Sequence, residues 1–134
     1  YLIVYEDGNI AFDGGLTTLD AVGNTIAVTI TNNTIPSNAT TDAASFIIDT
    51  TNKTIQSASG YYIGQTSNAN GLASNQSKTY ANTISFNDDG TVNIVSGGAY
   101  LRYNSTVNQE RFRYYKSSSY TGQKAIALYV RKAV

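Results

Sequence analysis

A repeated pattern of strands and bends constrains the fold of this chain more than any other feature. An apolar strand, a turn, a second strand, a glycine bend and an aromatic strand run from Phe46 to Tyr62, and again at the same separation from Ile84 to Tyr100. A fixed period of this kind indicates a fold built from structural repeats. We therefore expect Phe46 and Ile84 at equivalent core positions, and Tyr62 and Tyr100 to pack into the core at equivalent strand starts.

The two ends of the chain together supply a third copy of the pattern. Ile126 lies in the last apolar strand, where Phe46 and Ile84 lie in theirs, but the aromatic strand that should follow it is at the N-terminus. There Tyr1-Leu2 matches Tyr62-Ile63. A repeat divided in this way is expected when the last strand pairs with the first and leaves no sheet edge open. The pattern predicts Ile126 as the third core residue and Tyr1 as the third core tyrosine.

Length and composition fit a single all-β domain. The 134 residues suit one domain, and the 41% of hydrophobic residues are enough for a core. The repeats predict a closed barrel with pseudo-threefold repeats, in units of about 1–60, 61–99 and 100–134, with the extra residues of the first unit inserted between positions 13 and 41. A β-sandwich stays open as the alternative, because it gives similar strand spacing. No apolar run reaches the length of a membrane helix, so we expect no membrane span.

Three units of about four short strands resemble a β-trefoil. The order of apolar strand, turn, strand, glycine bend and Tyr-Leu is similar to the fascin-like branch of that fold. The closing segment, ERFRYYKSSSYTGQKAIALYVR, looks like the end of modules carried at the C-terminus of large secreted bacterial proteins. This resemblance implies an accessory module, secreted or at the cell surface, that is attached to upstream domains and has no catalytic residue. Sugar sites of the ricin type need a Gln-x-Trp motif, and this chain has no tryptophan.

The residue types present exclude several kinds of catalysis. Without histidine or cysteine, the sequence has no nucleophilic triad of the usual kind and no common zinc site. Most carboxylates lie in predicted turns, where aspartate accepts backbone N–H bonds. Neither a calcium-binding loop motif nor a phosphate-binding glycine loop occurs. We therefore expect no enzyme activity, no cofactor and no bound metal.

The net charge is zero, but the charges are unevenly distributed along the chain. Residues 1–100 carry two basic and eight acidic side chains, whereas residues 101–134 carry seven basic and one acidic. Such asymmetry can indicate an anionic partner such as nucleic acid or a sulfated glycan. The alternative is that the fold brings the two sets of charges together and they offset one another.

The basic aromatic segment from Arg102 to Lys116 is the best candidate for a binding site. Alternation along residues 111–115 puts Phe112 and Tyr114 on one face of a strand, and the two arginines and Tyr115 on the other. Arginine binds phosphate, sulfate or carboxylate through paired N–H groups, and tyrosine stacks on rings. The alternative is that the arginines cover apolar surface and pair with acidic residues. The candidate ligand-binding residues are Arg102, Tyr103, Asn104, Arg111, Arg113, Tyr115, Tyr61 and Tyr120.

The sequence predicts a non-catalytic binding module whose leading ligand is carbohydrate. Many tyrosines and asparagines and a charged fraction of only 13% suit weak contacts with sugars on exposed loops. One alternative is a polyanion binder that uses the basic C-terminal segment. Another is a structural module that packs against an upstream catalytic domain.

Overall fold

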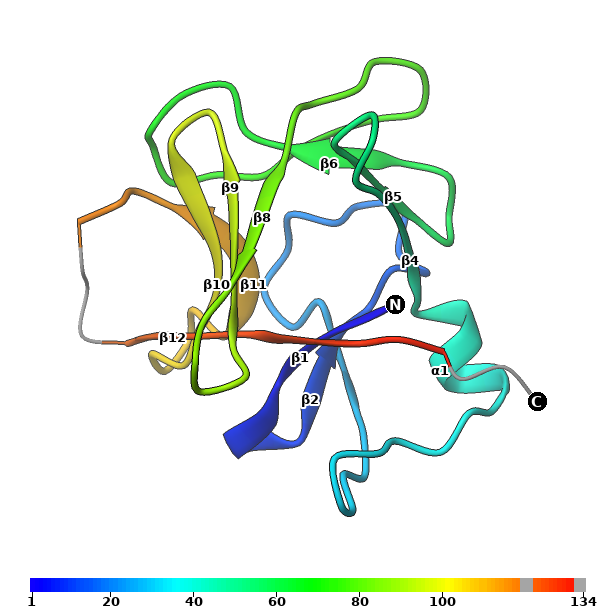
Figure 1. Ribbon diagram of the computed structural model, residues 1–134. Coiled ribbons are helices and arrows are strands. Elements are labelled where there is room, and N and C mark those ends of the chain that lie inside the picture. The colour runs from blue at the N-terminus through cyan, green and yellow to red at the C-terminus, as the bar shows by residue number, and fades with distance from the viewer. Residues whose placement is uncertain (119–121, 132–134) are drawn as a thin grey trace.

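The protein is all-β, as expected. A computed structural model describes residues 1–118 and 122–131, which form three antiparallel sheets of short strands (Figure 1). The helical part consists of a short turn, η1 (Glu6–Gly8), and one short helix, α1 (Ala39–Ala43). Among the described residues, no helix has the length and apolar character needed to cross a membrane.

Two sheets contain four strands and the third contains five, and the first sheet combines the two ends of the chain. The first sheet contains β13 (Ala127–Tyr129), β1 (Leu2–Tyr5), β2 (Ile10–Phe12) and β3 (Thr25–Ala27). The second contains β4 (Phe46–Asp49), β5 (Thr54–Ser57), β6 (Tyr62–Gly64) and β7 (Ala73–Asn75). The third contains β8 (Thr83–Phe86), β9 (Val92–Ser96), β10 (Ala99–Asn104) and β11 (Arg111–Tyr115), and β12 (Gln123–Lys124) pairs with β10. The expected pairing of the last strand with the first is therefore present.

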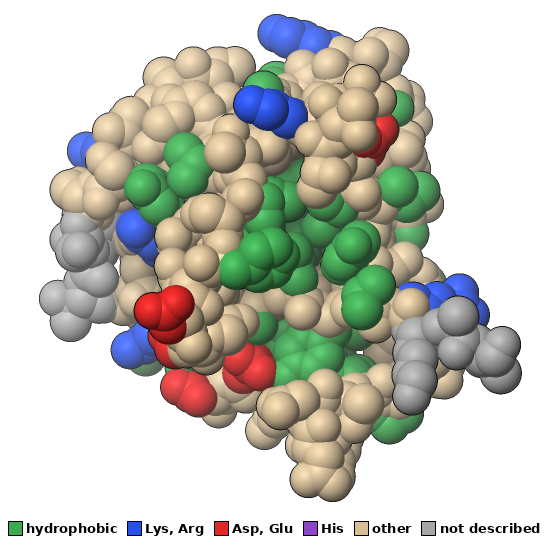
Figure 2. Space-filling view, in the orientation of Figure 1, with side chains coloured by type: hydrophobic (Ala, Val, Ile, Leu, Met, Phe, Trp, Pro, Cys, Tyr) green, Lys and Arg blue, Asp and Glu red, His purple; other side chains and the backbone are tan. Residues whose placement is uncertain are grey.

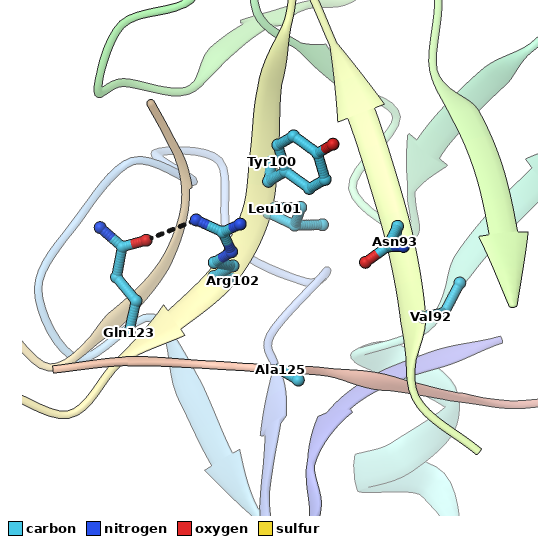
Figure 3. Close-up of a pocket in the computed structure, with 7 residues that line it drawn as sticks. All are labelled: Val92, Asn93, Tyr100, Leu101, Arg102, Gln123 and Ala125. Carbon is cyan, nitrogen blue, oxygen red and sulfur yellow. Dashed lines mark hydrogen bonds between the residues drawn. The ribbon is translucent and has the colours of Figure 1, made fainter. Parts of the chain in front are cut away.

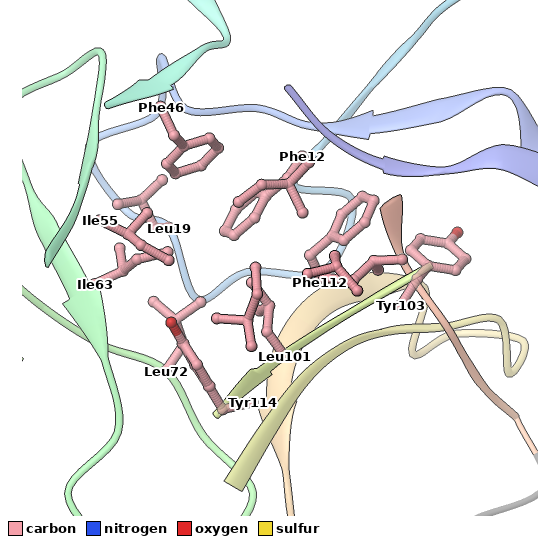
Figure 4. Close-up of a cluster of buried hydrophobic side chains, with 14 of the residues drawn as sticks. Phe12, Leu19, Phe46, Ile55, Ile63, Leu72, Leu101, Tyr103, Phe112 and Tyr114 are labelled. Atoms are coloured by element: carbon pink, nitrogen blue, oxygen red, sulfur yellow. The ribbon is translucent and has the colours of Figure 1, made fainter. Parts of the chain in front are cut away.

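Strand pairing gives the three sheets matching core positions. The second strands contribute Ile3, Ile55 and Ile94, and the third strands contribute Phe12, Ile63 and Leu101. All six side chains are buried in one cluster, where aromatic rings from the first and third sheets stack (Figure 4). Burying a side chain of this size stabilises the fold by about 1.5–3 kcal/mol, so this shared core is the main stabilising element.

Backbone hydrogen bonds join the sheets at their edges. Each bond joins a residue in or directly before the first strand of one sheet to a residue in or directly before the second strand of another, at matching positions. The bonds run from Phe46 N–H to Tyr1 O (2.8 Å), from Asn82 N–H to Lys53 O (2.8 Å) and from Val92 N–H to Ile126 O (2.9 Å). These bonds connect β4 with β1, β8 with β5, and β9 with β13.

The same bonds show which residues of the first strands are equivalent. Phe46 and Ile126 hold the same position and are each 1% exposed, as predicted. The third position belongs to Asn82, which is 2% exposed, so the prediction for Ile84 was wrong. Ile84 lies two residues further along, pairs with Ile94 and is only half-buried. Because Asn82 is polar, a pattern of repeated apolar residues passes over it and selects Ile84 instead.

The three tyrosines of the repeat are not core residues. Tyr1 is 40% exposed and precedes β1, a second strand, whereas Tyr62 and Tyr100 lie on third strands and are half-buried. Pairing in the first sheet puts Ala11, not Tyr1, at the position of Tyr62 and Tyr100. Successive strand residues point to opposite faces, so the buried Leu101 turns its neighbour Tyr100 outward.

Two long connecting segments follow β2 and β3. Residues 13–24 connect β2 to β3, and residues 28–45 connect β3 to β4 and include α1. Asn38 begins α1 with a capping box, accepting a bond from the N–H of Thr41 at 3.0 Å. The expected divisions between units do not coincide with the divisions between sheets. The division near residue 60 falls between β5 and β6, and the division near residue 99 falls within β10.

Candidate functional site

One face of the β10–β11 hairpin carries most of the candidate residues. The two strands pair over five residues, and their alternate side chains are buried in the core. The remaining side chains form three cross-strand pairs, which are Tyr100 with Tyr115, Arg102 with Arg113, and Asn104 with Arg111. The strand register thus brings Arg102, Asn104, Arg111, Arg113 and Tyr115 to one face of the hairpin, but the Tyr115 side chain is only 4% exposed, which corrects its expected role as a surface ligand.

The other candidates lie elsewhere. Tyr103 is 4% exposed, and its ring stacks on Tyr5 with 4.8 Å between the centroids, so it is a core residue; burial raises the pKa of its hydroxyl. Tyr61 precedes β6 in the second sheet and packs against the core. Tyr120 lies outside the described residues. Neither Tyr103 nor Tyr61 contributes to the surface of the hairpin.

Two of the three arginines on this face share one carboxylate. Asp20, in the loop between β2 and β3, accepts a hydrogen bond from Nη2 of Arg113 at 3.2 Å. Nε of Arg113 lies 3.0 Å from Oδ1 of Asp20, although this contact is too poorly aligned to be a hydrogen bond. Nη1 of Arg111 lies 3.7 Å from the same oxygen, and its Nη2 donates to Oε1 of Gln109 at 2.6 Å. The expected alternative, in which strand arginines pair with an acid, therefore holds for these two residues.

Arg102 has different surroundings. Its guanidinium carbon lies 4.7 Å from the ring centre of Tyr100, a cation–π contact. Its Nη1 donates to Oε1 of Gln123 at 2.8 Å and to the carbonyl of Lys116 at 3.5 Å. In the part of the chain that the structure describes, no carboxylate lies within 4.0 Å of it. Burial lowers the pKa of Arg102, because the partly desolvated charge is less well stabilised than in water.

Arg102 and its neighbours form the wall of a small pocket beside β10. The pocket has a volume of about 240 Å³ and is lined by Val92, Asn93, Tyr100, Leu101, Arg102, Gln123 and Ala125. Figure 3 shows Tyr100, Arg102 and Gln123 along one side and Asn93 on the other. Amide groups donate and accept hydrogen bonds, and the phenol ring offers an apolar surface. The pocket can therefore contact hydroxyl groups, apolar C–H groups and a negative charge at the same time.

A second, more open depression of about 650 Å³ adjoins this pocket. Asn104, Tyr115 and Lys124 contribute to it, and Gln123 lines both spaces. The hydroxyl of Tyr115 lies near the side chain of Asn104, and burial raises its pKa. The two depressions together could receive neighbouring units of an extended ligand.

A larger hollow lies away from the hairpin, between β13 and the segment 31–45. It has a volume of about 1010 Å³ and includes Tyr1, Leu128 and Val130. Figure 2 shows apolar side chains exposed near the middle of this face of the molecule. At its edge, Tyr129 donates a hydrogen bond from its hydroxyl to Oε2 of Glu6 at 2.6 Å. This hollow combines apolar surface with the carboxylates of Glu6, Asp42 and Asp89, which the pocket beside β10 lacks.

Some residues of the pocket and of the hairpin face were missed by sequence reasoning. Tyr100 could have been found, since alternation along β10 puts it on the same face as Arg102. No local pattern pointed to Gln123 or Asp20, because tertiary contacts bring them to the hairpin.

Among the described residues, no group of three or more carboxylates could hold a metal ion. Comparison with protein-family models, curated proteins and solved structures finds no match for the chain.

Proposed function

We propose that the three sheets form a β-trefoil, a closed barrel with a pseudo-threefold axis. Support comes from the first two strands of each sheet, because ladders and edge hydrogen bonds connect these strands in a ring. The matching core positions on the second and third strands also agree with threefold repetition. A β-sandwich needs two facing sheets, which three sheets with one shared core do not fit.

We also propose that the protein is a non-catalytic carbohydrate-binding module. The observation that carries this proposal is the pocket beside β10, where an aromatic ring, a guanidinium and two amides converge above an apolar floor. Ligand sites combine a mostly apolar lining with a few fixed polar groups, and a sugar ring offers hydroxyls and C–H faces to both. Neither this pocket nor the adjoining depression is lined by a carboxylate, so neither has the two acids of glycoside hydrolysis.

The module would serve as an accessory part of a larger secreted bacterial protein. The low charged fraction and the resemblance of the closing segment support this setting. In that role the module would hold the parent protein, and any catalytic domain upstream, close to a polymeric glycan. Binding at a single small site would be weak, and contact with repeated sugar units would strengthen attachment by raising the effective concentration.

The rival polyanion proposal depends on the basic C-terminal segment. Arg111 and Arg113 already share the charge of Asp20, which leaves less free positive charge on the hairpin than the sequence suggested. Salt distinguishes the two functions, because phosphate binding weakens steeply between low and physiological salt whereas neutral sugar binding hardly changes. The structural alternative would instead use the apolar hollow beside β13, through binding of an upstream domain.

A glycan array and a nucleic-acid titration, each at two salt concentrations, test the proposal. Tyr100→Ala should weaken binding to the best glycan about tenfold, which corresponds to about 1.4 kcal/mol. Tyr62→Ala is the matched control, because Tyr62 holds the same position in the second sheet but lies outside the pocket. Absence of glycan binding, or equal effects of the two substitutions, would contradict the proposal.

A further inference from the structure

We propose that the pocket beside β10 binds the single negative charge of an acidic sugar, a carboxylate or sulfate ester held by Arg102. This inference rests on the proposed carbohydrate-binding function and names the class of sugar. The observation behind it is a partly buried guanidinium that no acidic side chain neutralises.

The other arginines show how unusual Arg102 is in this chain. The sequence contains four arginines, and Arg111, Arg113 and Arg131 each lie within 4.0 Å of an aspartate. Arg102 has no such contact in the described part, and residues 119–121 and 132–134 contain no acidic side chain. Charges that are partly removed from water are normally paired, because desolvation is costly. A bound anion would supply the missing partner.

The guanidinium of Arg102 is held in place before any ligand binds. Its Nη1 is fixed by Gln123 and by the Lys116 carbonyl, and the ring centre of Tyr100 lies 4.7 Å from its central carbon. Nε and Nη2 donate to no other residue among those described. Figure 3 shows a terminal nitrogen directed away from Gln123, toward the side of the pocket where Asn93 lies. A rigid pair of N–H donors matches the two oxygens of a carboxylate or sulfate.

The size and polar groups of the pocket favour one sugar ring over a larger anion. Its volume of about 240 Å³ is below the roughly 300–1,000 Å³ of pockets for drug-sized ligands. Asn93 donates from Nδ2 to Asn87 at 3.0 Å and keeps a second N–H for a ligand hydroxyl. One positive charge in the lining suits a monoanion better than the successive phosphates of a nucleic acid.

Titrations followed by NMR test this inference. The probes are methyl glucuronide, glucose 6-sulfate, methyl glucoside, sodium acetate, sodium sulfate and a single-stranded oligonucleotide, each added to isotope-labelled protein. The wild type should bind at least one of the two acidic sugars about tenfold more tightly than methyl glucoside, with shifts in the Arg102 Nε–H and Gln123 amide signals. A preference for the glucuronide identifies a carboxylate ligand, and a preference for the sulfated sugar identifies a sulfate ester.

Two substitutions isolate the contribution of Arg102. Arg102→Gln should reduce the preference for the acidic sugar over methyl glucoside to about onefold, because the loss of the guanidinium weakens binding of the acidic sugar much more than binding of the neutral one. Arg131→Gln removes the same charge from an exposed residue outside the pocket and should keep the preference. If Arg102→Gln does not fold, Arg102→Lys provides the test, since it keeps the charge and loses the paired donors; the preference should fall at least threefold.

Each remaining outcome overturns part of the reasoning. Equal affinity for acidic and neutral sugars, or an unchanged preference in Arg102→Gln, would refute the inference and leave the carbohydrate proposal intact. Acetate or sulfate binding as tightly as the sugars would indicate a simple anion site and refute it. Tighter binding of the oligonucleotide would favour the polyanion function, and binding of no sugar at millimolar concentration would refute both proposals.

Discussion

Replacement of Asn24 by alanine should strongly destabilise the protein. The side chain is fully buried where the loop before β3 meets β11. Its Nδ2 donates to the carbonyls of Leu19 (2.8 Å) and Phe112 (2.9 Å), and its Oδ1 accepts the N–H of Phe112 at 2.9 Å. Asn24 therefore makes the hydrogen bonds to β11 that a neighbouring strand would otherwise make, at the contact between the first and third sheets.

The structure gives the size of the effect. Asn24→Ala leaves the N–H and the carbonyl of Phe112 without a partner, and each buried unsatisfied group costs about 1–3 kcal/mol. The Leu19 carbonyl loses one of two bonds, at a cost of about 1 kcal/mol, because it also accepts the N–H of Ala21 at 3.1 Å. Water that enters the vacated space would satisfy part of this demand, so we expect a loss of about 3–5 kcal/mol. A domain of this size is stable by about 5–15 kcal/mol. The substitution would thus remove a large share of the stability of the fold.

Urea denaturation measures the predicted change. With a slope of about 1–3 kcal/mol per molar urea, the midpoint should fall by roughly 2 M. Asn87→Ala is the control, because Asn87 is exposed and water can replace its side-chain bonds; its effect should stay below about 0.5 kcal/mol. A loss of less than about 1 kcal/mol in Asn24→Ala would refute the claim that these bonds hold the two sheets together.

Three further predictions follow from buried or strained groups. Burial raises the pKa of Tyr129 to about 12, so the native state favours the protonated hydroxyl. The stability that this preference contributes is present below pH 10 and is lost as the pH rises through 12. Thermal melting over this pH range should therefore show a smaller loss of stability in Tyr129→Phe than in the wild type. Asn82→Ala and Tyr114→Phe remove the same buried hydrogen bond of 2.5 Å, so urea denaturation of the double variant should show less than the sum of the two losses. Gly97 has φ of +60° and closely approached backbone, whereas Gly90 has φ of +88° and open space, so Gly97→Ala should lower the melting temperature more than Gly90→Ala.

The faces of the β10–β11 hairpin could be predicted from the sequence, because alternation is a local property of strands. Phe112 and Tyr114 are buried and Arg111 and Arg113 lie on the opposite face, as period-two alternation requires. The pairing of β13 with β1 was also predictable, since the repeat was divided between the chain ends. These features depend on neighbours in sequence or on a repeat that is visible in it.

Features set by tertiary contacts could not be predicted in the same way. Asn82 occupies a core position because Tyr114 and a backbone carbonyl satisfy its amide, and a pattern search for apolar residues passes over it. Asp20 lies in an irregular loop, and only the fold brings it to Arg111 and Arg113. The pocket likewise depends on β12, which is two residues long and contributes Gln123 through its pairing with β10.

The pairing of β1 with β13 has a consequence for the order of folding. The second and third sheets each form from contiguous segments, whereas β1 must wait for a strand near the other end of the chain. Contacts between distant residues form slowly, because a long loop must close first. During this delay β1 presents an unpaired edge, which is a template for strands of other molecules. Chains that are truncated before β13 should therefore associate through β1. Pairing of β13 with β1 completes the first sheet and removes this edge as a site of association.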